Sequence, residues 1–312
     1  MTTPPFGRHA VAMITPFTGD GALDPAGAQR LAGHLVDRGG CDALVLSGTT
    51  GESPTTTDAE KATLVRAVVE AVGDRARVLA GVGTNDTRHS VALARAAQAA
   101  GAHGLLVVTP YYSRPTQDAM VHHLRSVADA TELPVLLYEV PARTGRGTAL
   151  TVDSLRRLAE HPRVVGVKDS AFDLLKAGLV MAETDLAYYS GADEMNLPLF
   201  AVGGCGYIST LANVVGPQVR SVWDAFAAGD PETAAARHRA LLPLIDAVMN
   251  EVPGTVAVKA LFRAAGLPGG GVRGPLLPAD ERHTARLAEI LKEAISACAA
   301  AGSDRVVAPQ DR

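Results

Sequence analysis

Lys168 is the residue of this sequence whose position most clearly suggests chemistry. It follows the apolar run Val164–Val167, so a buried strand would end on its amine. Burying an ammonium group is costly unless it is paired or its pKa falls far enough to leave a neutral amine. A neutral amine is the nucleophile that condenses with a carbonyl carbon to form a Schiff base. A structural lysine, paired with Asp169 or Glu52, explains the same pattern equally well.

The other lysines are placed differently. The chain has five lysines against twenty-four arginines. Three of the others are predicted on helices that can solvate them, and the fourth lies in the C-terminal region: Lys61, Lys176 and Lys292, and Lys259. Side chains alternate along a strand, so Asp169 is predicted to point away from Lys168.

Two further segments carry groups that would complete such a site. Tyr138 ends the apolar run that begins at Val135, and its phenol could relay protons while a carbinolamine forms and loses water. An aromatic core residue is the alternative. The segment Ser47–Ser53 (Ser-Gly-Thr-Thr-Gly-Glu-Ser) offers glycine turns, hydroxyls and free amides that could hold a carboxylate. An α-keto acid needs both an amine at its carbonyl and donors at its carboxylate.

Arg143 and the pair Tyr111-Tyr112 follow two other predicted strands. The planar guanidinium of an arginine suits a second carboxylate, although a surface arginine is the default reading. Adjacent tyrosines on a strand-end loop are candidates for the site, and packing or a subunit contact is the alternative.

Composition excludes several classes of function. Apolar residues make up 47% of the 312 residues, and the formal net charge is -4. This acidic excess argues against nucleic acid and acidic membrane surfaces as partners. We expect no signal peptide, no membrane span, no metal cluster and no nucleotide-binding glycine motif. The scattered thiols of Cys41, Cys205 and Cys298 indicate reduced cysteines in a cytoplasmic protein.

The elements that must position these residues alternate along the chain. Apolar runs on consecutive positions are typical of parallel strands covered on both faces. Eight such runs are separated by amphipathic stretches, which predicts a (βα)8 barrel rather than a doubly wound sheet, since no glycine fingerprint follows the first run. The predicted strands are Ala10–Ile14, Ala43–Ser47, Val78–Val82, Gly104–Thr109, Val135–Tyr138, Val164–Lys168, Ala187–Ser190 and Gly206–Ile208. Active sites of such barrels lie at the C-terminal ends of the strands, where the residues above fall.

The clearest helices between strands are Asp58–Val72 and Arg88–Ala100, the second with Thr87 as its N-cap. The barrel is predicted to occupy residues 7–215 and a helical extension residues 216–301. The extension's helices are expected near Pro217–Ala228, Pro231–Met249, Val256–Ala265 and Ala279–Ala300. Residues 302–312 are polar and predicted to form a disordered tail.

Taken together, these motifs resemble those of the dihydrodipicolinate synthase / N-acetylneuraminate lyase superfamily, and more closely its synthase branch. The resemblance extends from about Gly7 into the C-terminal helices. It rests on Thr15-Pro16-Phe17, Gly48-Thr49-Thr50-Gly51-Glu52-Ser53, Gly83-Thr84-Asn85-Asp86-Thr87, Thr109-Pro110-Tyr111-Tyr112, Tyr138-Glu139-Val140-Pro141-Ala142-Arg143-Thr144-Gly145, Gly166-Val167-Lys168-Asp169 and Ser190-Gly191-Ala192-Asp193.

The resemblance implies a role for each site residue. Lys168 would form the Schiff base with pyruvate, and no external cofactor or metal would be needed. The remaining roles are carboxylate binding of pyruvate by Thr49 and Thr50, a proton relay of Tyr138, Thr50 and Tyr112, binding of the aldehyde's carboxylate by Arg143, and a pyruvate pocket lined by Gly191 and Ile208. Tyr112 would reach into a neighbouring subunit's site, in a homotetramer built as a dimer of dimers.

The implied reaction condenses pyruvate with L-aspartate 4-semialdehyde to give 4-hydroxy-tetrahydrodipicolinate, in lysine and diaminopimelate biosynthesis. The double threonine and Arg143 favour this reaction over sialic-acid cleavage. A related aldolase or dehydratase acting on 2-keto-3-deoxygluconate, 4-hydroxy-2-oxoglutarate or N-acetylneuraminate remains the alternative. A non-catalytic ligand-binding paralogue would be expected to have lost Lys168 or the tyrosines.

The chain departs from the family pattern at three places. Glu139 replaces the usual Asn or Asp, beside the arginine expected to bind substrate, and this keeps the alternative open. Pro253-Gly254-Thr255 replaces Pro-Asn-Pro ahead of a C-terminal helix. The lysine effector site of plant and enteric members would fall on Ser53, Pro54, Asp58, Lys61, Asn85, His89 and Tyr111. Because Lys61 would repel the effector's ammonium and His89 replaces an acid, we expect weak or absent feedback inhibition by lysine.

Overall fold

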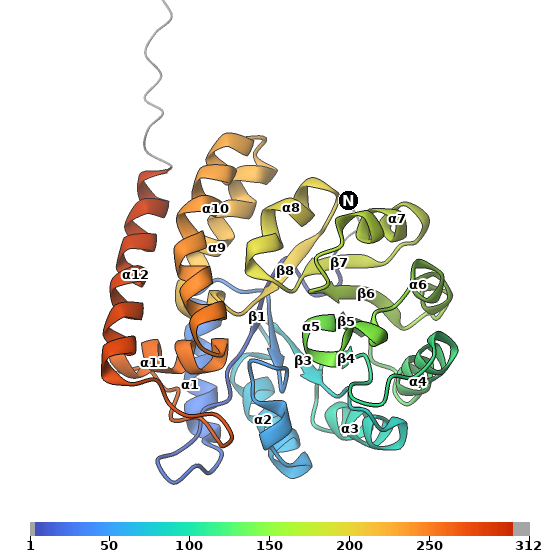
Figure 1. The fold of residues 1–312 in the computed structure, drawn as a ribbon. Helices are drawn as coiled ribbons and strands as arrows, with labels where there is room; N and C mark the ends of the chain where they lie inside the picture. The colour runs from blue at the N-terminus through green and yellow to red at the C-terminus, as the bar shows by residue number, and fades with distance from the viewer. Residues whose placement is uncertain (1–3, 302–312) are drawn as a thin grey trace, which may run out of the picture.

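Eight parallel strands close into a barrel, as the apolar runs predict. The computed structural model describes residues 4–301, and the strands pair in chain order, with β8 returning to β1 (Figure 1). They are β1 (His9–Ala12), β2 (Ala43–Leu46), β3 (Arg77–Gly81), β4 (Gly104–Val108), β5 (Val135–Glu139), β6 (Val164–Asp169), β7 (Ala187–Ser190) and β8 (Gly206–Ser209). The predicted (βα)8 fold is therefore confirmed, with strand ends displaced by at most two residues. The predicted tail, 302–312, lies outside the described residues.

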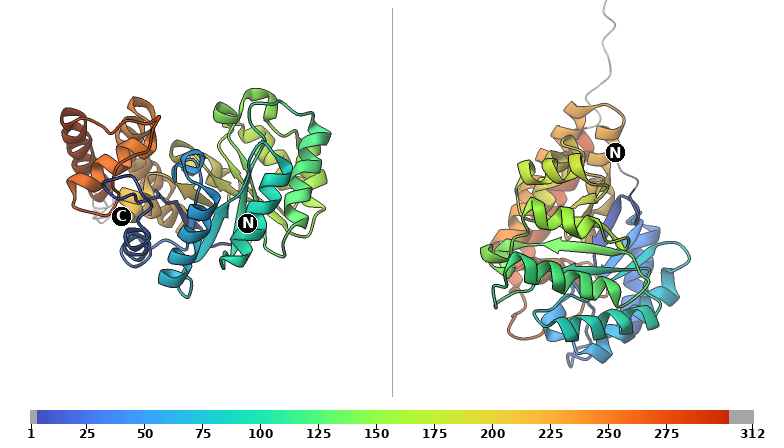
Figure 2. Two further views of the ribbon diagram at one scale, coloured as in Figure 1. Left: turned by 90° about the horizontal axis from the view of Figure 1, so that it is seen from below. Right: turned by 90° about the vertical axis from the view of Figure 1, so that its right-hand side faces the viewer.

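Helices surround the barrel (Figures 1 and 2). They are α1 (Pro25–Asp37), α2 (Asp58–Val72), α3 (Thr87–Ala99), α4 (Gln117–Asp129), α5 (Pro141–Thr144), α6 (Val152–Ala159), α7 (Leu174–Glu183) and α8 (Asn196–Ala201). Helix α2 has its predicted bounds because Thr57 and Glu60 form a capping box at its start. Helix α3 begins one residue earlier than predicted. Its N-cap is Asp86 rather than Thr87, since the Asp86 carboxylate accepts a hydrogen bond from the Arg88 amide.

The strands separate two apolar layers, and this alternation decides which side chains reach the site. One buried cluster fills the barrel and contains Leu136 and Tyr138 of β5. The other lies between barrel and helices and contains Leu137 of the same strand. Because successive strand residues point to opposite faces, Glu139 faces the helices while Tyr138 faces the interior.

The C-terminal extension consists of four helices packed along one side of the barrel, beside α1 and α8 (Figures 1 and 2). They are α9 (Ala212–Ala227), α10 (Pro231–Asp246), α11 (Gly254–Ala264) and α12 (Glu281–Ala300), with a π-helical turn (Ala247–Glu251) after α10. Helix α9 begins before Pro217, not at it as predicted, and is bent at Val215. Within residues 4–301 no single helix meets the length and hydropathy needed to span a membrane, and one pair meets them only together, across a 114° bend.

His9 is a buried titratable group at the start of β1. Its ring lies 5.3 Å from that of Tyr207, and its Nδ1 has no hydrogen-bond partner among the described residues. Burial lowers the pKa of His9 to about 4, an effect that nearby Asp42 opposes and Arg220 reinforces. The folded protein therefore holds this imidazole neutral at pH values where an unfolded histidine, with a pKa near 6.5, is charged.

We expect His9→Phe to flatten the acid limb of the stability profile. The unfolded state binds a proton at His9 as the pH falls below about 6.5, whereas the folded state does so only near 4. The contribution of His9 to the free energy of unfolding is thus fully present above pH 6.5. It decreases as the pH falls from 6.5 to 4, by about 3 kcal/mol at most. Urea unfolding at several pH values in this window, on wild type and variant, measures the difference. Parallel pH profiles would contradict this account.

Candidate active site

Lys168 and Tyr138 lie side by side inside the barrel. They are register partners on β6 and β5, and the Lys168 Nζ lies 4.2 Å from the centre of the Tyr138 ring. Lys168 is 5% exposed and Tyr138 6%. Both side chains belong to the C-terminal ends of their strands, where barrel enzymes place their chemistry.

The structure removes the structural alternative for Lys168. Glu52 instead pairs with Lys259, at 2.6 Å between Nζ and Oε1. Asp169 follows Lys168 on the opposite face of β6 and accepts a hydrogen bond from the Ala171 amide, which confirms the predicted orientation. Within residues 4–301 the buried amine of Lys168 has no ion-pair partner.

Gly191 lies against the Lys168 side chain, and Ile208 belongs to the barrel interior. A Cβ on Gly191 would come within 2.9 Å of Lys168 Cε and 2.3 Å of the Ser170 Oγ, so only glycine leaves the lysine room here. Ile208 on β8 is 1% exposed and belongs to the same interior cluster as Tyr138.

The two threonines follow β2 on a tightly wound turn. Ser47 and Glu52, at either end, have left-handed backbones with φ of 53° and 54°. Such conformations are costly for residues other than glycine and are found at functional sites. Thr49 is exposed, whereas Thr50 is buried and its hydroxyl lies 2.9 Å from that of Thr210 after β8. Among the described residues, no hydrogen bond joins Thr50 to Tyr138 or Tyr112.

A cavity of about 470 Å³ opens at this end of the barrel. Thr49, Tyr138 and Arg143 line this cavity. Tyr138, the neighbour of Lys168, therefore shares one pocket with the two residues predicted to bind carboxylates, Thr49 and Arg143. Among the described residues that line this cavity, Lys168, Thr50, Gly191 and Ile208 are absent. The positions expected for an effector also gather on its wall: Ser53, Pro54, Asp58, Lys61, Asn85, His89 and Tyr111.

Glu139 does not lie beside Arg143, the arginine expected to bind substrate, as the sequence suggested. It is 1% exposed and faces the outer helices, where its carboxylate lies 2.8 Å from Lys176 Nζ. Burial raises the pKa of Glu139, and the Lys176 ammonium opposes this shift. Arg143, by contrast, is exposed on α5 and faces the cavity. The substitution at Glu139 therefore does not alter the lining of the pocket.

Tyr112 stands apart from the other predicted site residues. It is 91% exposed, has a left-handed backbone with φ of 74°, and does not line the cavity within the described chain. Its neighbour Tyr111 does line it. Within a single described chain, the Tyr112 side chain therefore does not take part in the cavity of the same chain.

Sequence patterns missed three features of the site. Ser47 has a buried hydroxyl with no partner among the described residues and lines the cavity. Lys176 was expected to be solvated, yet its side chain is 12% exposed and paired with Glu139. The Glu52–Lys259 pair joins residues 207 positions apart. No local motif could indicate either pairing, although the scarcity of lysines is a signal that each one has a specific place.

Comparisons with known proteins identify one matching family. Residues 5–294 match the family described as Dihydrodipicolinate synthetase family. The chain is 62% identical over 284 residues to 4-hydroxy-tetrahydrodipicolinate synthase 1 of Streptomyces coelicolor, covering 91% of this chain and 92% of that one. It is 56% identical over 285 residues to the 4-hydroxy-tetrahydrodipicolinate synthase of Acidothermus cellulolyticus, with 91% of each covered.

Solved structures of dihydrodipicolinate synthases are also similar to this chain. A dihydrodipicolinate synthase of Bacillus anthracis superposes with a TM-score of 0.89 at 38% identity, covering 93% of this chain and 99% of the other. The enzyme of Cyanidioschyzon merolae, solved with lysine bound, gives a TM-score of 0.88 at 35% identity, covering 93% and 98%.

Proposed function

Since the chain belongs to the dihydrodipicolinate synthetase family, we propose that Lys168 forms a Schiff base with pyruvate and that the derived enamine attacks L-aspartate 4-semialdehyde. Its enzymatic activity is the formation of 4-hydroxy-tetrahydrodipicolinate, a lyase reaction, as the names of its curated relatives indicate. The observation that carries the mechanism is the buried amine of Lys168, unpaired within residues 4–301 and 4.2 Å from the Tyr138 ring.

The chemistry follows from this amine. Its nitrogen adds to the pyruvate carbonyl carbon, and water leaves to give the imine. Loss of a methyl proton gives an enamine whose carbon attacks the aldehyde. The amine of the second substrate then adds to the imine carbon, closing the ring and releasing Lys168. The covalent bond to lysine supplies the electron sink, so the reaction needs no external cofactor.

Carboxylate recognition is assigned to two segments, the threonine turn after β2 and the loop that carries Arg143. Thr49 and Thr50 would hold the pyruvate carboxylate through their hydroxyls and the amides of the turn. Arg143, exposed on the cavity wall, would pair with the carboxylate of the aldehyde. Gly191 and Ile208 would enclose the bound pyruvate.

The proton relay is assigned to Tyr138, Thr50 and Tyr112. Tyr138 is next to the amine, and its phenol can accept and return the protons exchanged as water leaves. Tyr112 would come from a second copy of the chain, which its 91% exposure permits. We therefore propose a homo-oligomer, a dimer of dimers by analogy with the family, that acts in the cytoplasm.

The alternative keto-acid aldolases lose their main support. They were kept open because Glu139 was expected beside Arg143, but Glu139 faces Lys176 behind the strand. The curated relatives named above carry the synthase name.

A coupled assay with pyruvate and aspartate semialdehyde tests the function. We expect turnover of this pair, and borohydride with pyruvate should leave an adduct that peptide mass analysis places on Lys168. Inactivity with this pair, together with cleavage of a sugar-derived keto acid, would transfer the protein to the alternative.

Millimolar L-lysine should leave the rate of the purified enzyme essentially unchanged. At the cavity positions expected for an effector, Lys61 donates hydrogen bonds to the carbonyls of Ser53 and Thr56, at 2.9 and 2.6 Å. His89 Nε2 lies 2.9 Å from the Asp58 carboxylate, so this acidic group already has a partner. An ammonium effector would thus meet a cation and no free acid among these residues. Initial rates with and without lysine measure this, and strong inhibition would contradict it.

A further inference from the structure

Two buried ion pairs lie outside the cavity, each behind a different substrate-binding segment. The first joins Glu52 and Lys259, whose side chains are 2% and 3% exposed. The second joins Glu139 and Lys176, at 0% and 12%. Most ion pairs of the described chain are far more exposed, for example Arg157 with Asp118 at 39% and 84%. Buried pairs are costly to assemble and their geometry is correspondingly defined.

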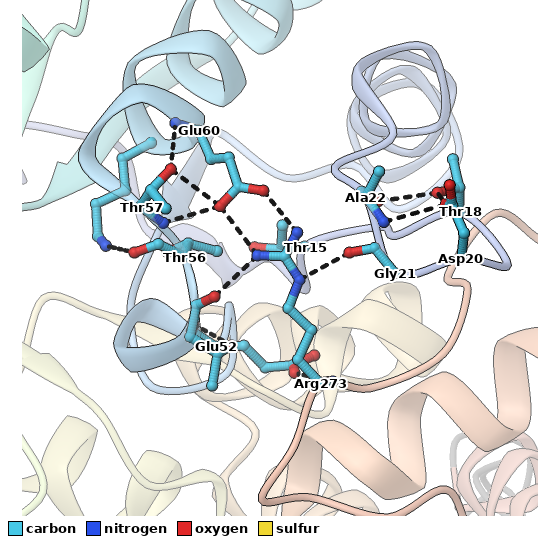
Figure 3. A network of polar contacts seen from close by, with 12 residues as sticks. Thr15, Thr18, Asp20, Gly21, Ala22, Glu52, Thr56, Thr57, Glu60 and Arg273 are labelled. Carbon is cyan, nitrogen blue, oxygen red and sulfur yellow. Dashed lines mark hydrogen bonds and ion pairs between the residues drawn. The ribbon is translucent and has the colours of Figure 1, made fainter.

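The first pair fixes the turn that carries Thr49 and Thr50. Glu52 ends this turn, and its second carboxylate oxygen accepts the Arg273 amide at 2.9 Å (Figure 3). Arg273 also pairs with Glu60 at 2.6 Å and so spans from the turn to α2. Lys259, on α11, reaches the same carboxylate. The turn is thereby held from the C-terminal extension.

A neighbouring contact adds a second link from α11. The Thr255 hydroxyl donates to the backbone carbonyl of Thr50 at 2.9 Å. Thr255 belongs to the segment Pro253-Gly254-Thr255 that departs from the family pattern. The departure therefore places a hydroxyl directly on the backbone of a threonine assigned to pyruvate binding.

The second pair closes the loop that carries Arg143. This loop leaves β5 at Glu139 and returns at Leu150, whose amide donates to the Glu139 carboxylate at 2.8 Å. Lys176 Nζ binds both ends, at 2.8 Å from the Glu139 carboxylate and 3.4 Å from the Leu150 carbonyl. The base of the loop is thus anchored to α7, while Arg143 projects from it into the cavity.

We propose that Glu52–Lys259 and Glu139–Lys176 are positioning pairs that act on different substrates. The first would set the affinity for pyruvate through the threonine turn, and the second the use of the aldehyde through the Arg143 loop. This inference rests on the proposed function. Small displacements of a binding group by a distant residue can cost up to about a hundredfold in rate.

The test compares Lys259→Met with Lys176→Met in the full-length protein. Two quantities are measured: the pyruvate concentration that half-saturates borohydride trapping on Lys168, and the KM for aspartate semialdehyde at saturating pyruvate. We expect Lys259→Met to raise the first by at least about tenfold and to leave the second nearly unchanged. Lys176→Met should do the reverse.

Controls separate positioning from loss of the fold. Arg157→Met removes the exposed ion pairs with Asp118 and Asp153 and should change neither quantity, because such pairs contribute little. Circular dichroism checks folding of every variant. Where a methionine variant does not fold, Lys259→Arg or Lys176→Arg keeps the charge with altered geometry and should shift the same quantity in the same direction.

Three outcomes are distinguishable. Selective and opposite shifts support the proposal. Equal shifts of both quantities in both variants, or no shift in either, overturn it. If the wild type traps pyruvate but does not use the aldehyde, the proposed function fails. The trapping data then still test the first pair: an unchanged half-saturating pyruvate concentration in Lys259→Met, or an altered one in Lys176→Met, overturns the inference.

Discussion

Lys168→Ala should lose the pyruvate adduct and reduce the rate of condensation by at least about a thousandfold. The substitution removes the nucleophile itself, and groups that act as a unit with a lost nucleophile cannot compensate. Lys168 is 5% exposed inside the barrel, beside Tyr138. Borohydride trapping with peptide mass analysis and a steady-state assay measure the two effects.

Two variants control this experiment. Lys168→Arg keeps a cation of similar length but cannot form the imine, so we expect it to be as inactive as Lys168→Ala. Lys292→Ala removes an exposed lysine from α12 and should behave as wild type. An adduct that persists in Lys168→Ala, on any other lysine, would refute the assignment.

The second large effect is expected from Arg143→Ala. This variant should reduce kcat/KM for aspartate semialdehyde by about a hundredfold, because a charge-assisted hydrogen bond to a carboxylate is worth roughly 1.5–3 kcal/mol and more when bidentate. Trapping of pyruvate on Lys168 should be unchanged, since Arg143 lies on a different wall segment from the threonine turn.

The selectivity of that loss is its decisive feature. Arg143→Lys keeps the charge without the planar fork and should recover only part of the activity. Arg282→Ala, at an exposed position on α12, should retain full activity and is the control for the loss of any surface arginine. If Arg143→Ala weakened pyruvate trapping as strongly as aldehyde use, the assignment to the second carboxylate would be wrong.

Local patterns were sufficient for the barrel. A strand covered on both faces must be apolar at consecutive positions, so β4 and β7 are recognisable without any long-range information. Capping is equally local, which is why α2 has the predicted bounds. The predicted start of α9, in the extension, was wrong. This helix begins before a proline and is bent at Val215, and the spacing of its apolar residues indicates neither feature.

Sequence patterns alone were enough to predict the barrel, its strand-end lysine and tyrosine, and the family to which the chain belongs. These depend on residues near one another in the chain or on motifs of fixed spacing. The pairing of the charges is evident only in the folded chain, where Glu52 pairs with Lys259 rather than Lys168. Likewise, Glu139 pairs with Lys176 and does not lie near Arg143. The physical reason is that an ion pair depends on which faces the closed barrel and its extension bring together. Residues 207 positions apart carry no local sign of that contact.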